Sequence, residues 1–213
     1  PLARKRHGRV IPLYVGAGGE RPAWLSVPSD MGDVVDEPEI GVAGDVGEEI
    51  LGCARRLKPD LLLLHWKGQP SRGRYLLGRT LDPVVLYAPC DVAVVRAPGK
   101  AAEFVERMRR LRRVLVPSGG GPNASLALDL ALDLGDDVQV TALRVASRRS
   151  GPTAIAEQWQ ILRDVLGQWP GEERLNAQVA LASGVTEGIL AQVDASCDLV
   201  LIGATRESLV DRL

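Results

Sequence analysis

Short aliphatic runs alternate with helix-length amphipathic stretches along the whole of the 213-residue chain. This alternation is typical of βα units on a parallel sheet, and it predicts an α/β fold. Strands of a parallel sheet covered on both faces read as continuous apolar runs. The runs 61–64 and 199–202 have this character, so we expect both to be central strands. The predicted strands are residues 9–15, 39–42, 60–66, 91–96, 113–117, 137–145, 175–180 and 199–203.

Three of the connecting stretches carry clear helix signals. Asp45 followed by Glu48 predicts an amino-terminal cap, and Pro59 predicts the end of that helix. Apolar residues at helical spacing over 155–169 predict a helix whose two tryptophans face the core. Residues 125–134 alternate strictly with leucine, as a strand would, but Ala and Leu without β-branching favour a helix. We therefore predict a helix there.

Composition excludes several classes of protein. No aliphatic run approaches the ~18 residues of a membrane-spanning helix. With 26 basic and 27 acidic side chains, the chain has no overall charge to attract nucleic acid, which is not an expected partner. Three widely spaced cysteines predict neither a disulfide framework nor a metal site. A cytoplasmic location is expected, at the cytosolic face of the inner membrane if a membrane domain is attached.

The two halves of the chain resemble one another in order. Residues 9–15 align with 139–145, 46–51 with 185–190, and 60–64 with 198–202. The repeat predicts two tandem domains, 1–98 and 112–213, joined by a linker over 99–111. The first lacks an opening strand and the second a closing one, so both are expected to be truncated. A first residue Pro1 without Met, and the lack of a secretion signal, suggest a piece of a longer protein.

Glycine motifs follow the predicted strand 60–66. Gly68 and Gly78, with nine residues between them, precede Arg79 and Thr80, and a segment Ala-Pro-Cys leads into the strand 91–96. This pattern resembles the carboxy-terminal half of a universal stress protein domain. The resemblance implies a doubly wound, five-stranded parallel sheet of the adenine nucleotide alpha hydrolase type. It also implies that the glycines and the hydroxyl contact the phosphates of ATP or AMP in members that bind them.

The second half resembles the other end of the same pattern. Pro117, Ser118 and Gly119 match the family's first strand and loop, and Gly203 matches the first glycine of the later motif. The candidate nucleotide-binding residues are thus Gly68, Gly78, Thr80, Pro117, Ser118, Gly119 and Gly203.

Four positions depart from the family pattern. His65 replaces a glycine, Arg79 a hydroxyl, Gly119 an aspartate and Arg206 a glycine. A side chain narrows the approach to a phosphate, and an arginine either binds the phosphate or fills its place. Weak or lost nucleotide binding is therefore expected. For His65 a half-buried histidine at a strand end is favoured over a ligand role.

Two readings of function share this fold. The segments Ser-Gly-Gly-Gly-Pro-Asn and Gly-Ala-Thr-Arg-Glu-Ser are similar to tandem stress-protein tails fused to bacterial permeases and cation antiporters. The resemblance implies a non-catalytic regulatory module of a membrane transporter. The alternative is a free-standing stress protein that binds ATP or AMP.

An enzyme is the third alternative. The loop that starts at Ser118 is partly similar to the pyrophosphate loop of ATP pyrophosphatases, but Pro122 takes the aspartate position and donates no amide. The chain shows no acid/base pair or Cys/His dyad, so we expect no catalysis. A glycine turn capped by Asn123 explains the same residues more simply.

The predicted strand from Asp91 to Arg96 is apolar and short. An edge of this kind exposes unpaired backbone groups and pairs readily with another chain. We expect self-association through this strand, or pairing of the two tandem domains through their last strands.

Overall fold

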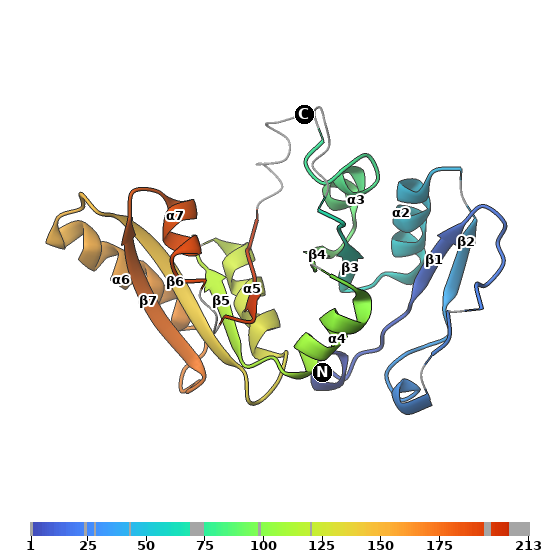
Figure 1. Ribbon diagram of the computed structural model, residues 1–213, viewed down its shortest axis with the longest axis horizontal. Helices are drawn as coiled ribbons and strands as arrows, with labels where there is room; N and C mark the ends of the chain where they lie inside the picture. The colour runs from blue at the N-terminus through green and yellow to red at the C-terminus, as the bar shows by residue number, and fades with distance from the viewer. Residues whose placement is uncertain are drawn as a thin grey trace. The chain divides into compact units, whose positions relative to one another are not determined.

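The computed structural model describes residues 2–23, 25–27, 29–42, 44–68, 75–97, 99–119, 121–193 and 197–204. The chain divides into two compact units (Figure 1). The carboxy-terminal unit comprises Val105–Ala204 together with residues 2–5, and the amino-terminal unit comprises Arg6–Phe104. The boundary falls inside helix α4 (Ala101–Arg109), which occupies most of the segment 99–111.

The carboxy-terminal unit has one continuous parallel sheet. Its strands are β5 (Arg113–Pro117), β6 (Gln139–Ser147), β7 (Leu175–Ala182) and β8 (Leu199–Val200), in the spatial order β7-β6-β5-β8. Its connections carry α5 (Pro122–Leu132), α6 (Pro152–Leu166) and α7 (Val185–Leu190). The short helix α1 (Leu2–Lys5) joins this unit, because Lys5 Nζ donates to the Leu132 carbonyl at 3.2 Å and to Asp136 at 2.7 Å.

Both faces of this sheet are covered. On one face, β5 and β6 pack against α5 and α6 around the fully buried Leu128 and Leu162, and the predicted core tryptophans Trp159 and Trp169 pack there half-buried. On the other face, Ile189 of α7 packs with a second cluster. The unit is an α/β fold with a parallel sheet, as the sequence predicts.

The amino-terminal unit has two separate sheets. Its strands are β1 (Leu13–Gly16), β2 (Glu39–Val42), β3 (Leu61–His65) and β4 (Asp91–Val95). Strand β1 pairs in parallel with β2, and β3 pairs in parallel with β4. The remaining elements are the short 3-10 turn η1 (Ser29–Met31) and the helices α2 (Val46–Leu57) and α3 (Leu81–Tyr87).

Helix α2 links these two sheets. It packs against β1 and β2, and its Leu51 forms a small buried cluster with Val84 and Ala88 that also contacts β3 and β4. Asp45 caps α2 as predicted, accepting hydrogen bonds from the amides of Gly47 and Glu48 at 2.8 and 3.1 Å.

Two strand predictions are wrong in part. Residues 9–12 do not belong to β1, since Pro12 has no amide to donate and Val10 makes only an isolated bridge to Val35. Among the described strands, β3 pairs only with β4 and β8 is the last strand of the other sheet, so the runs 61–64 and 199–202 are not central there. Leu63 is accordingly 67% exposed. The helix prediction for 125–134 is confirmed by α5. None of the described helices is long and apolar enough to cross a membrane.

Candidate functional site

Ser118 lies directly after β5, at the carboxyl edge of the continuous sheet. Its amide donates to the Leu143 carbonyl of β6 at 2.8 Å, which fixes the residue against the neighbouring strand. The side chain is only 6% exposed, and its Oγ has no hydrogen-bond partner among the described residues. A buried hydroxyl without a partner is costly, so this atom is a candidate ligand contact.

The amino terminus of α5 faces the same loop. Its cap residue is Gly121, and no side chain caps the helix. A Cβ built on Gly119 or on Gly121 would meet no atom within 4 Å, so there is open space beside the loop. Uncapped amides at a helix start carry partial positive charge and favour an anion. The predicted cap by Asn123 is wrong, because Asn123 Nδ2 donates instead to the Ala204 carbonyl at 2.6 Å.

Gly203 completes this group of residues. It follows β8 and packs so closely on the start of α5 that a Cβ would overlap the Asn123 carbonyl oxygen. Four predicted site residues, Pro117, Ser118, Gly119 and Gly203, are thereby brought together at one sheet edge. Arg206 lies outside the described residues.

Arg144 is a neighbour that sequence reasoning missed. It lies on β6, half-buried, and its Nη1 is 3.4 Å from the Ser118 carbonyl oxygen. Its Nε donates to Gln158 Oε1 of α6 at 2.8 Å. Burial lowers the pKa of this guanidinium below its ordinary value. The sequence feature that could have identified Arg144 is its charge, the only one within the largely apolar run 139–145.

The predicted residues of the amino-terminal unit form a different arrangement. Gly68 adopts φ +73°, and a Cβ there would overlap Arg96 Nε, so the arginine fills the space beside it. That guanidinium lies 5.6 Å from the centre of the Trp66 ring. Gly78 adopts φ +115° and has open space, while Thr80 precedes α3 without capping it. The segment 69–74 between Gly68 and Gly78 lies outside the described residues.

A carboxylate holds the amides near Gly78. Asp82, only 2% exposed, accepts hydrogen bonds from the amides of Leu76 and Leu77, both at 2.7 Å. These two backbone donors are therefore satisfied by a negative charge of the chain itself. An external anion would meet a carboxylate there, whereas the Ser118 hydroxyl has no partner among the described residues.

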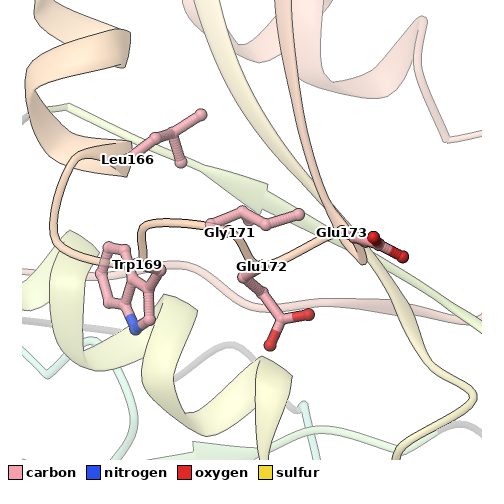
Figure 2. A pocket seen from close by; sticks show the side chains of 6 residues that line it. Leu166, Trp169, Gly171, Glu172 and Glu173 are labelled. Atoms are coloured by element: carbon pink, nitrogen blue, oxygen red, sulfur yellow. The ribbon is translucent and has the colours of Figure 1, made fainter.

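A hollow of about 300 Å³ lies elsewhere in the carboxy-terminal unit (Figure 2). Trp169, Glu172 and Leu175 are among its lining residues, near the amino end of β7 and so at the opposite edge of the sheet from Ser118. Trp169 Nε1 donates to Asp129 at 2.9 Å, and Arg174 donates to both carboxylate oxygens of Glu172. Because these polar groups satisfy one another, we assign the hollow a structural role.

A second hollow, of about 420 Å³, is lined by a single loop of the amino-terminal unit, from Tyr14 to Ala23. It contains none of the predicted site residues. Among the described residues, no group of three or more His, Cys, Asp or Glu side chains is arranged to hold a metal ion.

One part of the chain matches the model of a known protein family. Residues 27–96 match the universal stress protein family, and this segment lies in the amino-terminal unit. No curated protein matches the chain.

Two solved structures resemble the chain. Protein Rv1636 of Mycobacterium tuberculosis H37Rv is 17% identical, with a TM-score of 0.36, over 44% of this chain and 71% of that protein. A protein of the universal stress protein family from Burkholderia pseudomallei is 22% identical, with a TM-score of 0.35, over 47% of this chain and 86% of that protein.

Proposed function

We propose that the chain is a non-catalytic, universal-stress-protein-like regulatory module that binds an adenine nucleotide weakly, at the Ser118 loop. The observation that carries this proposal is the buried Ser118 hydroxyl without a partner, beside the uncapped start of α5. The family match of residues 27–96 supports the general class. Weak binding is expected because Gly119 brings no side chain where nucleotide-binding relatives usually carry an aspartate.

Calorimetric titration of the full chain with ATP, ADP and AMP tests this proposal. We expect a dissociation constant weaker than ~100 μM, and binding that is weaker again by about fivefold in Ser118→Ala. The control is Ser183→Ala, an exposed serine of the same unit. Because the Ser118 hydroxyl has no partner, its removal should not lower the melting temperature. A micromolar, stoichiometric signal would favour the free-standing nucleotide-binding protein instead.

The absence of catalysis is part of the proposal. Incubation with ATP, magnesium and carboxylate or amine acceptors should release neither pyrophosphate nor phosphate above a protein-free control. Pro122 at the start of α5 supports this expectation, since it donates no amide to a pyrophosphate. Pyrophosphate release that disappears in Ser118→Ala would establish the pyrophosphatase alternative.

We further propose that the module is the cytosolic part of a bacterial membrane transporter. The support is the likeness of its altered glycine motifs to those of stress-protein tails of permeases and antiporters. The reading frame upstream of Pro1 decides this point. About ten or more hydrophobic spans there would support the transporter. A nearby start codon would favour a free-standing cytoplasmic protein.

The strand orders support two tandem domains of one type. The carboxy-terminal order β7-β6-β5-β8 has a strand, β5, between β6 and β8. In the aligned amino-terminal half, β2-β1 and β3-β4 are separate pairs, with no described strand between β1 and β3. We propose that the two units are tandem domains of one type, in which β1 corresponds to β6 and β3 to β8.

We propose that self-association occurs through β4. Strand β4 pairs only with β3 among the described strands, so its other edge has unpaired donors and acceptors. Light scattering on the full chain should show oligomers that Val94→Lys disperses. Val185→Lys is the matched control, because Val185 is an exposed valine of the other unit. Dispersal by Val185→Lys alone, or a monomeric parent chain, would contradict the model.

A further inference from the structure

Arg144 is a charged residue in an otherwise apolar part of β6. The side chains of Val140 and Ala142 belong to the core on the α5 and α6 side of the sheet, and Arg144 is the next residue of that alternating series. It therefore stands where the core ends and the carboxyl edge of the sheet begins. Its half-burial keeps the guanidinium partly out of water.

No carboxylate of the described residues forms an ion pair with this guanidinium. Its two hydrogen bonds go to neutral oxygens, those of the Gln158 side chain and the Ser118 backbone. None of the ion pairs among the described residues includes Arg144. Arg148, directly after β6, does form one, with its Nη2 2.9 Å from Oε1 of Glu187. A partly buried cation without a counter-charge is unfavourable, and the pKa lowered by burial reflects that cost. A bound anion would relieve it.

Two side-chain donors lie at the Ser118 loop, the Ser118 hydroxyl and the Arg144 guanidinium. The start of α5, which no side chain caps, follows the same loop and adds the partial positive charge of a helix amino terminus. A phosphoryl group offers three acceptor oxygens that point in different directions, and arginine binds such groups through several N–H donors. A neutral nucleoside offers no comparable charge.

We propose that Arg144 determines the specificity of this site by binding a phosphoryl group, so that the site takes phosphorylated ligands and rejects nucleosides. The inference rests on the proposed function for the location of the site and its nucleotide ligand, and adds the residue that selects the phosphoryl group. Gln158 is a positioning residue, since it holds the guanidinium through Nε while Nη1 lies toward the Ser118 carbonyl.

NMR titration of the full chain with ATP, adenosine and inorganic pyrophosphate tests the proposal. We expect ATP and pyrophosphate to bind more weakly to Arg144→Gln than to the parent, by at least about fivefold, as for loss of one charge-assisted hydrogen bond. Arg144→Lys should recover part of the affinity, because it keeps the charge without the planar fork. Arg163→Gln, on the exposed face of α6, should bind like the parent.

The three ligands distinguish the proposed role of Arg144 from the proposed nucleotide site. If ATP binds equally well to the parent and to folded Arg144→Gln, the role of Arg144 is overturned while the nucleotide site stands. If pyrophosphate binds with dependence on Arg144 but ATP does not bind, the nucleotide proposal falls and the phosphoryl site stands. Adenosine binding as tight as ATP binding would overturn the specificity. Should Arg144→Gln not fold, weaker ATP binding by Arg144→Lys than by the parent supports the proposal, and equal binding overturns it.

Discussion

The two units place similar apolar strands in different surroundings. In the carboxy-terminal unit, β5 lies between β6 and β8, and its Val114, Leu115 and Val116 are all buried. In the amino-terminal unit, the equally apolar β3 has β4 as its one described partner, and its Leu63 is largely exposed. The number of neighbouring strands therefore decides burial here, because a sheet with free edges and a thin cover cannot enclose its residues.

The glycine loops differ in the same way. At the Ser118 loop, the buried Ser118 hydroxyl has no partner among the described residues, and the Arg144 guanidinium beside it contacts only neutral oxygens there. Near Gly78, the buried carboxylate of Asp82 takes the amides of Leu76 and Leu77. One loop is open to an anion, and the other is closed by an acidic side chain of the same chain.

The largest expected effect separates the two cores. Leu128→Ala should cost about 4 kcal/mol of unfolding free energy, because Leu128 is fully enclosed by strands and helices that cannot collapse. Leu51→Ala should cost only about 2 kcal/mol, since the neighbours of Leu51 in its small cluster are mostly half-buried and can close the space. Native-state hydrogen exchange gives the unfolding free energy of each unit separately, from the exchange rates of that unit's own amides. Equal costs would remove the distinction between the cores.

A smaller effect concerns two glycines of the Ser118 loop region. Gly203→Ala should destabilise the carboxy-terminal unit by about 1–3 kcal/mol, because the new Cβ would overlap the backbone of Asn123. Gly119→Ala is the matched change and should cost under about 0.5 kcal/mol, since open space surrounds it. Urea unfolding compares them. If Gly203→Ala does not change the unfolding free energy, the residues after β8 do not pack tightly on α5. The carboxy-terminal unit would then be as loosely packed here as the amino-terminal unit is around β3.

The smallest effect is an acid dependence. Arg174 donates to the Glu172 carboxylate and lowers its pKa below the ordinary value of 4.5. This stabilisation is present above that value and is lost as the pH falls through the lower folded-state pKa. Glu172→Gln should therefore cost no more than about 1 kcal/mol at neutral pH and nothing in strong acid.

Two variants complete this measurement by urea unfolding against pH. Glu173→Gln, the exposed neighbour, should change nothing at either pH. In the amino-terminal unit, Glu39→Gln should cost less than Glu172→Gln, because Arg56 and Glu39 meet at 3.3 Å with both side chains well exposed. If Glu39→Gln loses more unfolding free energy than Glu172→Gln, the ion pair of the amino-terminal unit is the stronger one and this prediction is wrong.

Local signals in the sequence predicted most of the elements. Asp45 identified the start of α2, and the lack of β-branching over 125–134 identified α5 against its strand-like alternation. The position of β3 could not be predicted in this way, because an apolar run reports a preference for burial and not how many strands stand beside it.

The candidate site was predicted in part for the same reason. Ser118 and Gly203 belong to motifs that can be read along the chain, and the structure brings them together through Asn123. Arg144 belongs to no motif, and its role depends on a contact across 26 residues with the Ser118 carbonyl. Asp82 likewise acts through backbone amides five and six residues away, which no side-chain pattern reveals.

The Asp82 contact has a consequence for selectivity in solution. A carboxylate attached a few residues from its amide donors is present at a high effective concentration, about millimolar or above for a short tether. Any dissolved anion must compete with this resident group, which never diffuses away. A free anion must therefore reach a far higher concentration to displace Asp82 than to fill the site proposed at the Ser118 loop, so under our proposal the chain responds to such an anion through that loop alone.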